Sequence, residues 1–283
     1  MENEIIQVQQ ADMLSALNRS EIDQQVATAK QYPRNLPSVL NQIQTYATMD
    51  VDTASECFYV LHRDGATGTQ VIEGLSVRMA EIIAGAWGNL RVATRIIGND
   101  GKTITAQAVC HDLETNVAIC TEVKRSILTK KGYTFSQDMQ VVTGNAAAAI
   151  AFRNAVLKVI PKAVTKRVIE EVKKVAMGQA LDLETQRQTL VQYFAKFNVT
   201  EQMILDLLQI TKREELDKER VFLLKGIYNA IKEGDTTVQE AFLKPVEERR
   251  LAEEAKKKSD DKKSKAAAAI KKQSEAPAEA AEN

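Results

Sequence analysis

The chain has 283 residues, and its 38 Lys and Arg residues balance 38 Asp and Glu residues, so the formal net charge is zero. Hydrophobic residues make up 44% of the chain but aromatic residues only 5%, which predicts a core of Val, Ile, Leu and Ala. No apolar run approaches the roughly 20 residues of a membrane-spanning helix, and the first ten residues lack a signal-peptide pattern. We therefore expect a cytoplasmic protein with no membrane partner.

Cysteine and histidine are too sparse to indicate a metal cofactor. Cys57, Cys110 and Cys120 show no CxxC spacing, so we interpret them as reduced, semi-buried thiols. The two histidines are too few for most histidine-based metal sites. We expect no cofactor of any kind.

The N-terminal third should contain helices and one strand. Residues 1–31 are polar and are expected to form a flexible, loosely helical segment. Two prolines then disfavour helix in the residues before them, and Ser38 is a candidate N-cap for the helix that follows. Residues 57–62 have the pattern of a strand, and residues 63–70 are expected to be a loop or a hairpin connection.

The middle of the chain predicts a helix, a three-stranded meander and a second helix. Apolar residues at helical spacing occur over 74–86. Turn-forming residues at 98–101 and 112–116 separate three expected strands, at 90–97, 102–111 and 117–128. A long helical segment is expected from Ala146, with Pro161 kinking it or starting a new helix. The fold class is therefore α+β, with an antiparallel meander of three or more strands flanked by helices.

Composition divides the chain into four parts. After the N-terminal segment, an α+β core is expected over 32–178, followed by a small helical module over 181–243. Residues 244–283 are rich in Lys, Glu and Ala and should be a charged tail that frays into disorder after about Ser259.

Positive charge is concentrated in residues 121–174, where eleven basic residues face four acidic ones. The net charge of about +7 in this stretch predicts a polyanionic partner, and nucleic acid is the usual one. A lysine row can follow a phosphate backbone, and an exposed aromatic ring can stack on bases. The candidate DNA-binding residues are Lys124, Arg125, Lys130, Lys131, Tyr133, Arg153, Lys158, Lys162 and Lys166.

The sequence offers little for catalysis. The glycines of Gly98–Thr103 are separated by two residues instead of four and precede a strand, so a hairpin turn is favoured over a phosphate-binding loop. Asp112 and Glu114 follow His111 and leave open a metal-dependent nuclease. A second alternative is a non-catalytic assembly or interaction protein of a mobile element, with the lysines serving only solubility. The main expectation is a DNA-binding protein that is not an enzyme.

Two stretches carry a resemblance to a known family. Ile72-Glu-Gly-Leu-Ser-Val-Arg78-Met-Ala-Glu81 resembles the first core helix of phage annealing proteins of the Erf and RecT/Red-beta type. Gln140-Val-Val-Thr-Gly-Asn-Ala-Ala-Ala-Ala-Ile-Ala-Phe-Arg-Asn154-Ala-Val-Leu-Lys158-Val-Ile-Pro161 resembles their Arg-containing helix that contacts DNA. The resemblance covers roughly 32–177 and includes the order of helix, meander and helix.

The resemblance implies ATP-independent annealing of complementary single-stranded DNA in phage or prophage recombination and repair. It implies a homo-oligomeric ring or filament in the bacterial cytoplasm, with Arg153 in contact with DNA. It also implies that the C-terminal module recruits a partner nuclease or a host single-strand-binding protein.

Overall fold

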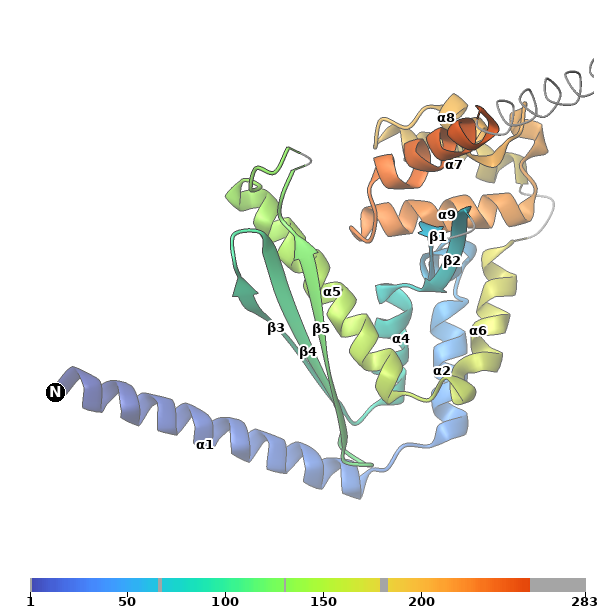
Figure 1. The fold of residues 1–283 in the computed structure, drawn as a ribbon. Helices are drawn as coiled ribbons and strands as arrows, with labels where there is room; N and C mark the ends of the chain where they lie inside the picture. The colour runs from blue at the N-terminus through green and yellow to red at the C-terminus, as the bar shows by residue number, and fades with distance from the viewer. Residues whose placement is uncertain (1, 66–67, 130, 179–182, 255–283) are drawn as a thin grey trace, which may run out of the picture.

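The computed structural model describes residues 2–65, 68–129, 131–178 and 183–254. It contains a three-stranded antiparallel sheet and a separate two-stranded sheet, both flanked by helices (Figure 1). This arrangement confirms the α+β expectation and the antiparallel meander. No helix in the described ranges is long and apolar enough to cross a membrane.

The chain begins with α1 (Glu2–Gln31), a continuous helix that leads away from the rest of the molecule in Figure 1. The next helix, α2 (Leu36–Ala47), is capped by Asn35, whose side-chain oxygen accepts the backbone N–H of Ser38 at 3.0 Å. The expectation that Ser38 is the cap is wrong, because Pro37 fits the first turn, where the missing N–H has no intrahelical partner to lose.

Of the loop and the hairpin connection expected at 63–70, the structure has the hairpin. After α3 (Val51–Glu56), β1 (Phe58–Gly65) pairs antiparallel with β2 (Gly68–Leu75) along their full length. Helix α4 (Val77–Trp87) therefore starts three residues later than predicted. Its cap is Ser76, whose hydroxyl accepts the N–H of Met79.

The meander consists of β3 (Leu90–Asn99), β4 (Thr103–Asp112) and β5 (Val117–Ser126), in that spatial order. The carboxylate of Asp100 closes the first turn by accepting the backbone N–H groups of Lys102 and Thr103. The second turn contains Asn116 at a φ of 58°, a left-handed conformation that Asn tolerates.

Helix α5 (Gln137–Val159) packs on one face of this sheet and begins at the cap Ser136, well before the predicted start at Ala146. Gly144 is buried inside the helix, and a Cβ there would lie 3.6 Å from the side chain of Ile96. Small buried residues follow it on the same face and let the helix lie close to the strands: Ala147, Ala151 and Ala155.

Pro161 ends α5 and precedes α6 (Lys162–Ala176), so the predicted interruption by this proline is confirmed. The two helices run in different directions (Figure 1), because α6 packs against α2 and α3 instead of the sheet. Their buried side chains join α2, α4 and β4 in one core cluster that includes Ile43, Met79, Ile83, Ala106 and Val172.

The C-terminal region comprises α7 (Leu183–Ala195), α8 (Glu201–Leu208), α9 (Lys218–Lys232) and the π-helical turn η3 (Gln239–Leu243). Its own core cluster includes Val60 from β1, while Phe222 of α9 meets Phe58 edge-on at 5.4 Å. The region is thus docked on the first hairpin. Helical residues continue to 254; the rest of the expected tail, with Ser259, lies outside the described residues.

Candidate nucleic-acid interface

The two faces of the meander have different surroundings. Along β4, alternate residues from Ile104 to Cys110 are buried toward α5, whereas Thr105, Gln107 and Val109 on the opposite face are half-buried. In the part of the chain that the structure describes, α5 is the helix that packs on the sheet, and its other side is left uncovered (Figure 1). We call this side the open face.

The open face carries more positive than negative charge. Strand pairing places Arg95 of β3 across from Gln107 and Glu122, and places Lys124 of β5 across from Thr105. Arg91 lies on the same face, four residues before Arg95 on β3. Glu122 is the one carboxylate on the open face of the three strands, and it accepts only a 3.4 Å hydrogen bond from Gln107. Among the described residues, none of the three cations forms an ion pair.

A tight loop extends this surface at one end of the sheet. The N–H of Thr129 donates to the carbonyl of Tyr133 at 2.8 Å, and Gly132 between them adopts a φ of 83°. The hydroxyl of Thr134 donates to Gly101 in the neighbouring turn at 3.0 Å. The loop therefore holds Lys131 and Tyr133 beside the turn that carries Lys102. Tyr133 is 71% exposed; Lys130 lies outside the described residues.

Arg125 does not lie on the open face. The alternation of β5 turns its side chain toward α5, opposite to Lys124. Its guanidinium donates to the backbone carbonyls of Gly234 and Asp235, the latter at 3.3 Å. Arg125 therefore joins the sheet to the C-terminal region and is removed from the candidate DNA-contacting set.

Arg153 is likewise an interior residue, contrary to the DNA contact that the resemblance implies. Its side chain is only 8% exposed and forms a 2.7 Å ion pair with the 3%-exposed carboxylate of Asp235. The guanidinium also lies 4.5 Å from the ring centre of Tyr59. Because the guanidinium of Arg153 is buried and paired with Asp235, it is not accessible to a nucleic acid.

The remaining lysines form a second, separate surface. Lys158, Lys162 and Lys166 are exposed around the corner between α5 and α6, and Lys166 has only a 4.0 Å contact with Glu170. Tyr133 precedes α5 and Lys158 lies in its last turn, and a 23-residue helix is about 34 Å long. The basic window of the sequence therefore divides into two surfaces at opposite ends of α5, and one continuous groove is not formed.

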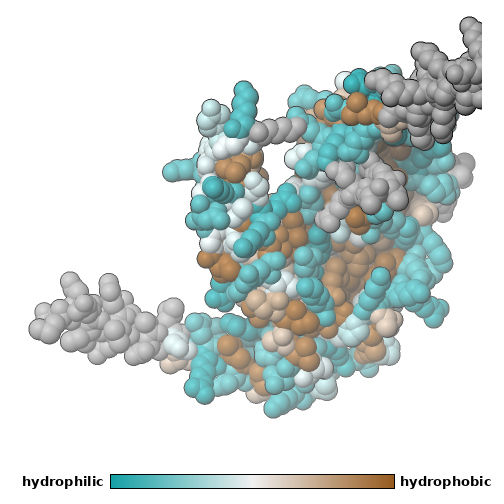
Figure 2. All heavy atoms as spheres, in the orientation of Figure 1, coloured by the Kyte–Doolittle hydropathy of each residue, from teal (hydrophilic) through white to brown (hydrophobic). Residues whose placement is uncertain are grey.

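A cleft of about 470 Å³ lies between α5 and the ends of α4 and α9. Figure 2 shows the corresponding hollow between the upper end of the sheet layer and the C-terminal helices. Its lining has three carboxylates against two basic groups: Glu56, Glu81 and Glu233 against Arg78 and Lys232. This balance disfavours a polyanion, so the open face is the better candidate.

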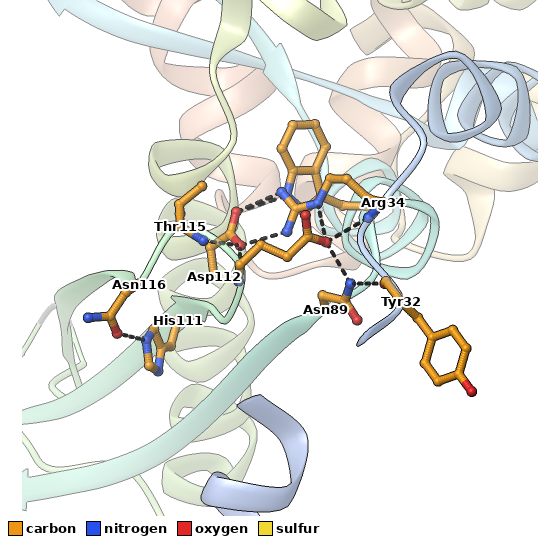
Figure 3. Close-up of polar contacts among 9 residues, drawn as sticks. Tyr32, Arg34, Asn89, His111, Asp112, Thr115 and Asn116 are labelled. Carbon is orange, nitrogen blue, oxygen red and sulfur yellow. Dashed lines mark hydrogen bonds and ion pairs between the residues drawn. The ribbon is translucent and has the colours of Figure 1, made fainter. Parts of the chain in front are cut away.

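Asp112 and Glu114, the residues of the nuclease alternative, belong to a network centred on Arg34 (Figure 3). The guanidinium of Arg34 donates to both oxygens of Asp112, at 2.7 and 2.6 Å, and to Glu114 at 3.0 Å. It also lies 4.5 Å from the ring centre of Trp87, whose indole N–H donates to Asp112 at 3.2 Å.

This network keeps Asp112 ionised. Burial is the largest influence and raises its pKa, but hydrogen bonds from Arg34, Trp87 and the Glu114 N–H, with the Arg34 charge, together lower the pKa to about 2. His111 faces the opposite way, toward Asn116 (Figure 3). Across the described ranges, no group of three His, Cys, Asp or Glu residues is placed to hold a metal ion. The two carboxylates serve as an ion-paired clamp between Arg34 and the end of β4.

Comparison with protein-family models, with curated proteins and with solved structures found no match to this chain.

Reasoning from charge density missed Arg91 and Arg95, because both precede the basic window. Their strand alternates apolar Leu90 and Val92 with these arginines, a period-two pattern that places both arginines on one face. The alternation could have identified both arginines, because it assigns the residues of a strand to its two faces, whereas net charge does not.

Proposed function

We propose that the open face binds the sugar–phosphate backbone of single-stranded DNA, and that the protein promotes ATP-independent annealing of complementary strands. The observation that carries the proposal is the set of three unpaired cations on an uncovered sheet face: Arg91, Arg95 and Lys124. Unpaired cations replace the counterions of phosphates on binding, which gives salt-dependent affinity without sequence preference.

The dimensions of the open face favour a single strand. Three strands spaced about 4.8 Å apart give a surface roughly 10 Å across, wide enough for one backbone. The exposed Tyr133 ring at the end of this surface offers a stacking partner, a contact worth about 1–3 kcal/mol per base. Lys102 and Lys131 continue the positive charge around the same end.

Annealing requires that the backbone be held while base edges stay free to pair. An open sheet without a facing wall meets this requirement better than an enclosed groove. The order α4, meander and α5 supports the same idea, since it matches the layout of the annealing proteins that the sequence resembles. The proposal includes assembly into a ring or filament and a phage or prophage source. It also includes a location in the bacterial cytoplasm and recruitment of a nuclease or a single-strand-binding protein.

Fluorescence anisotropy with a labelled oligonucleotide, repeated across salt concentrations, tests the binding surface. The double variant Arg95→Glu/Lys124→Glu should weaken binding at least 100-fold and flatten the salt dependence. The matched control, Lys158→Glu/Lys162→Glu, reverses the same number of charges at the other end of α5 and should stay within threefold of the unsubstituted protein. The opposite ranking would move the site to the corner between α5 and α6.

An annealing assay with two complementary oligonucleotides and no ATP tests the activity. Accelerated duplex formation, lost in the open-face variant, is the expected result. If the protein binds single-stranded DNA but does not accelerate duplex formation, its function is backbone binding without annealing. A stable oligomer that is not retained on single-stranded DNA at low salt would favour the assembly protein instead.

A further inference from the structure

A second cavity lies away from the sheet, between α3, α7 and α9. Its volume is about 240 Å³, below the roughly 300–1,000 Å³ of pockets for drug-sized ligands. It is therefore suited to a small group instead of a large molecule. The lining is mostly polar and aromatic and includes Asp52, Ser55, Tyr193, Lys196, Lys225 and Tyr228.

Lys225 places a positive charge in this cavity with incomplete compensation. Its side chain is only 13% exposed, yet the nearest carboxylate oxygen, on Asp52, is 3.6 Å away and belongs to a side chain that is 80% exposed. The other contact of its ammonium group is the hydroxyl of Ser55, at 3.3 Å. Because a charge removed from water is costly without a close partner, this ammonium group favours an additional anion.

The other groups in the cavity are mainly unused donors. The rings of Tyr193 and Tyr228 stack with centroids 5.3 Å apart, and neither hydroxyl has a hydrogen-bond partner among the described residues. The ammonium of Lys196 lies 5.4 Å from the Tyr193 ring centre and forms no ion pair with a described residue.

The acceptors of the cavity are already engaged. Glu56 pairs with Lys232 at 3.1 Å. The side-chain amide of Asn229 donates to the carbonyls of Ser55 and Phe58, which fixes α9 against the turn before β1. The ammonium group of Lys196 has no ion pair with a described residue, and that of Lys225 has only the distant Asp52. Together with the two tyrosine hydroxyls, they favour a ligand that is negatively charged and rich in acceptors.

We propose that this cavity binds a phosphate monoester through Lys225 and Lys196, with the tyrosine hydroxyls as further donors. A phosphate monoester is close to a dianion at pH 7 and presents three acceptor oxygens, which matches two cations and two hydroxyl donors. The group can belong to a small phosphorylated molecule or to the terminal phosphate of a nucleic-acid strand. The inference goes beyond the proposed function and does not depend on it.

Isothermal titration calorimetry of the full chain at constant ionic strength tests the site, with inorganic phosphate and ribose 5-phosphate as probes. Saturable one-to-one binding is expected, weakened at least tenfold in Lys225→Met and severalfold in Tyr193→Phe. The control is Lys174→Gln, which removes an exposed lysine paired with Glu171 on α6 and should bind like the unsubstituted protein. Circular dichroism tests whether each variant is folded. If Lys225→Met does not fold, the phosphate affinity of Tyr193→Phe tests the site.

Short oligonucleotides with a 5′-phosphate or a 5′-hydroxyl distinguish the two sources. If the protein prefers the phosphorylated strand and Lys225→Met abolishes that preference, the ligand is the terminal phosphate of a strand. If both strands bind equally while ribose 5-phosphate still binds, the ligand is a small phosphorylated molecule. The open-face variant Arg95→Glu/Lys124→Glu should keep its phosphate affinity. The phosphate site can therefore fail or hold independently of the proposed DNA-binding surface. Absence of saturable binding by both phosphate probes, or unchanged binding in Lys225→Met and Tyr193→Phe, would overturn the inference.

Discussion

Arg153 of α5 and Asp235, three residues beyond the end of α9, form a 2.7 Å ion pair whose two side chains are almost completely buried. The pair joins residues 82 positions apart, and Arg125 reaches the same segment through the carbonyls of Gly234 and Asp235. Two arginines of the basic window therefore fasten the C-terminal helices to the sheet layer. Their positive charge contributes to the composition of the window but not to its exposed surface.

Replacing Asp235 with Ala should strongly destabilise the protein. The change leaves the buried guanidinium of Arg153 without its carboxylate, and breaking a buried pair in this way costs about 3–5 kcal/mol. Urea unfolding followed by circular dichroism measures the loss.

The matched control is Glu81→Ala, which breaks the exposed i,i+3 pair with Arg78 on α4 and should cost less than about 1 kcal/mol. Equal losses in the two variants would show that the Arg153–Asp235 pair is not a structural tie.

The sequence predicted the meander well because period-two alternation and turn residues are local signals. Gly98–Gly101 and Asp112–Asn116 mark turns whatever packs on the strands. Which face is covered depends on α5, which is distant in sequence from β3, so the position of Arg91 and Arg95 on the uncovered face could not be predicted from the strand alone. The role of Arg153 was hidden for the same reason, since Asp235 lies far along the chain.

The predicted starts of α4 and α5 were wrong because tertiary contacts override weak local signals. The helix expected from Ala146 begins at Gln137, so Gly144 lies inside α5, where it lets the helix approach Ile96 and Ile104. The strand β2 contains two glycines and little apolar alternation, and it is held by pairing with β1. In both cases the deciding partner lies on another element.

Substituting Gly226 should destabilise the contact between α9 and β1. A Cβ at this position would lie 2.5 Å from Cγ2 of Val60 and 3.1 Å from its backbone nitrogen, so Gly226→Ala forces the helix and strand apart. Overpacking of this kind costs about 1–3 kcal/mol, which thermal or urea unfolding can measure.

Gly85→Ala provides the control, because Gly85 lies inside α4 and a Cβ there meets nothing within 4 Å. That variant should be stabilised by roughly 0.5–1 kcal/mol, since alanine is the better helix former. Stabilisation by both substitutions would contradict the close approach of α9 to β1.

The clamp at Asp112 should contribute to acid unfolding. Its pKa is lowered to about 2, against about 3.9 for an ordinary Asp, so the unfolded chain binds the proton first as the pH falls. The stabilisation is therefore complete above about pH 4 and is lost as the pH falls toward 2; its full size is about 2.6 kcal/mol. In urea titrations, Asp112→Asn should be less stable than the unsubstituted protein at pH 7, and the difference should shrink between pH 4 and 2. A difference that stays constant with pH would contradict this role.

Cys120 should report directly on the occupancy of the open face. It is exposed and shares that face with Lys124, whereas Cys57 and Cys110 are buried. Burial, assisted by Glu56 and Asp112 respectively, raises the pKa of Cys57 to about 12 and that of Cys110 to about 11. Because the thiolate is the reactive form, a maleimide should label one cysteine in the folded protein and three after unfolding, as mass spectrometry can show.

Saturating single-stranded DNA should then slow the labelling of Cys120, because on the open face the strand register places this residue between the levels of Arg91 and Lys124. The variant Arg95→Glu/Lys124→Glu retains the thiol but loses the proposed anchors, so its labelling rate should be the same with and without DNA. Strong DNA binding by the unsubstituted protein with no change in the Cys120 rate would place the strand elsewhere, and the exposed lysines between α5 and α6 would become the surface to test. The labelling experiment thus separates occupancy of the open face from affinity alone.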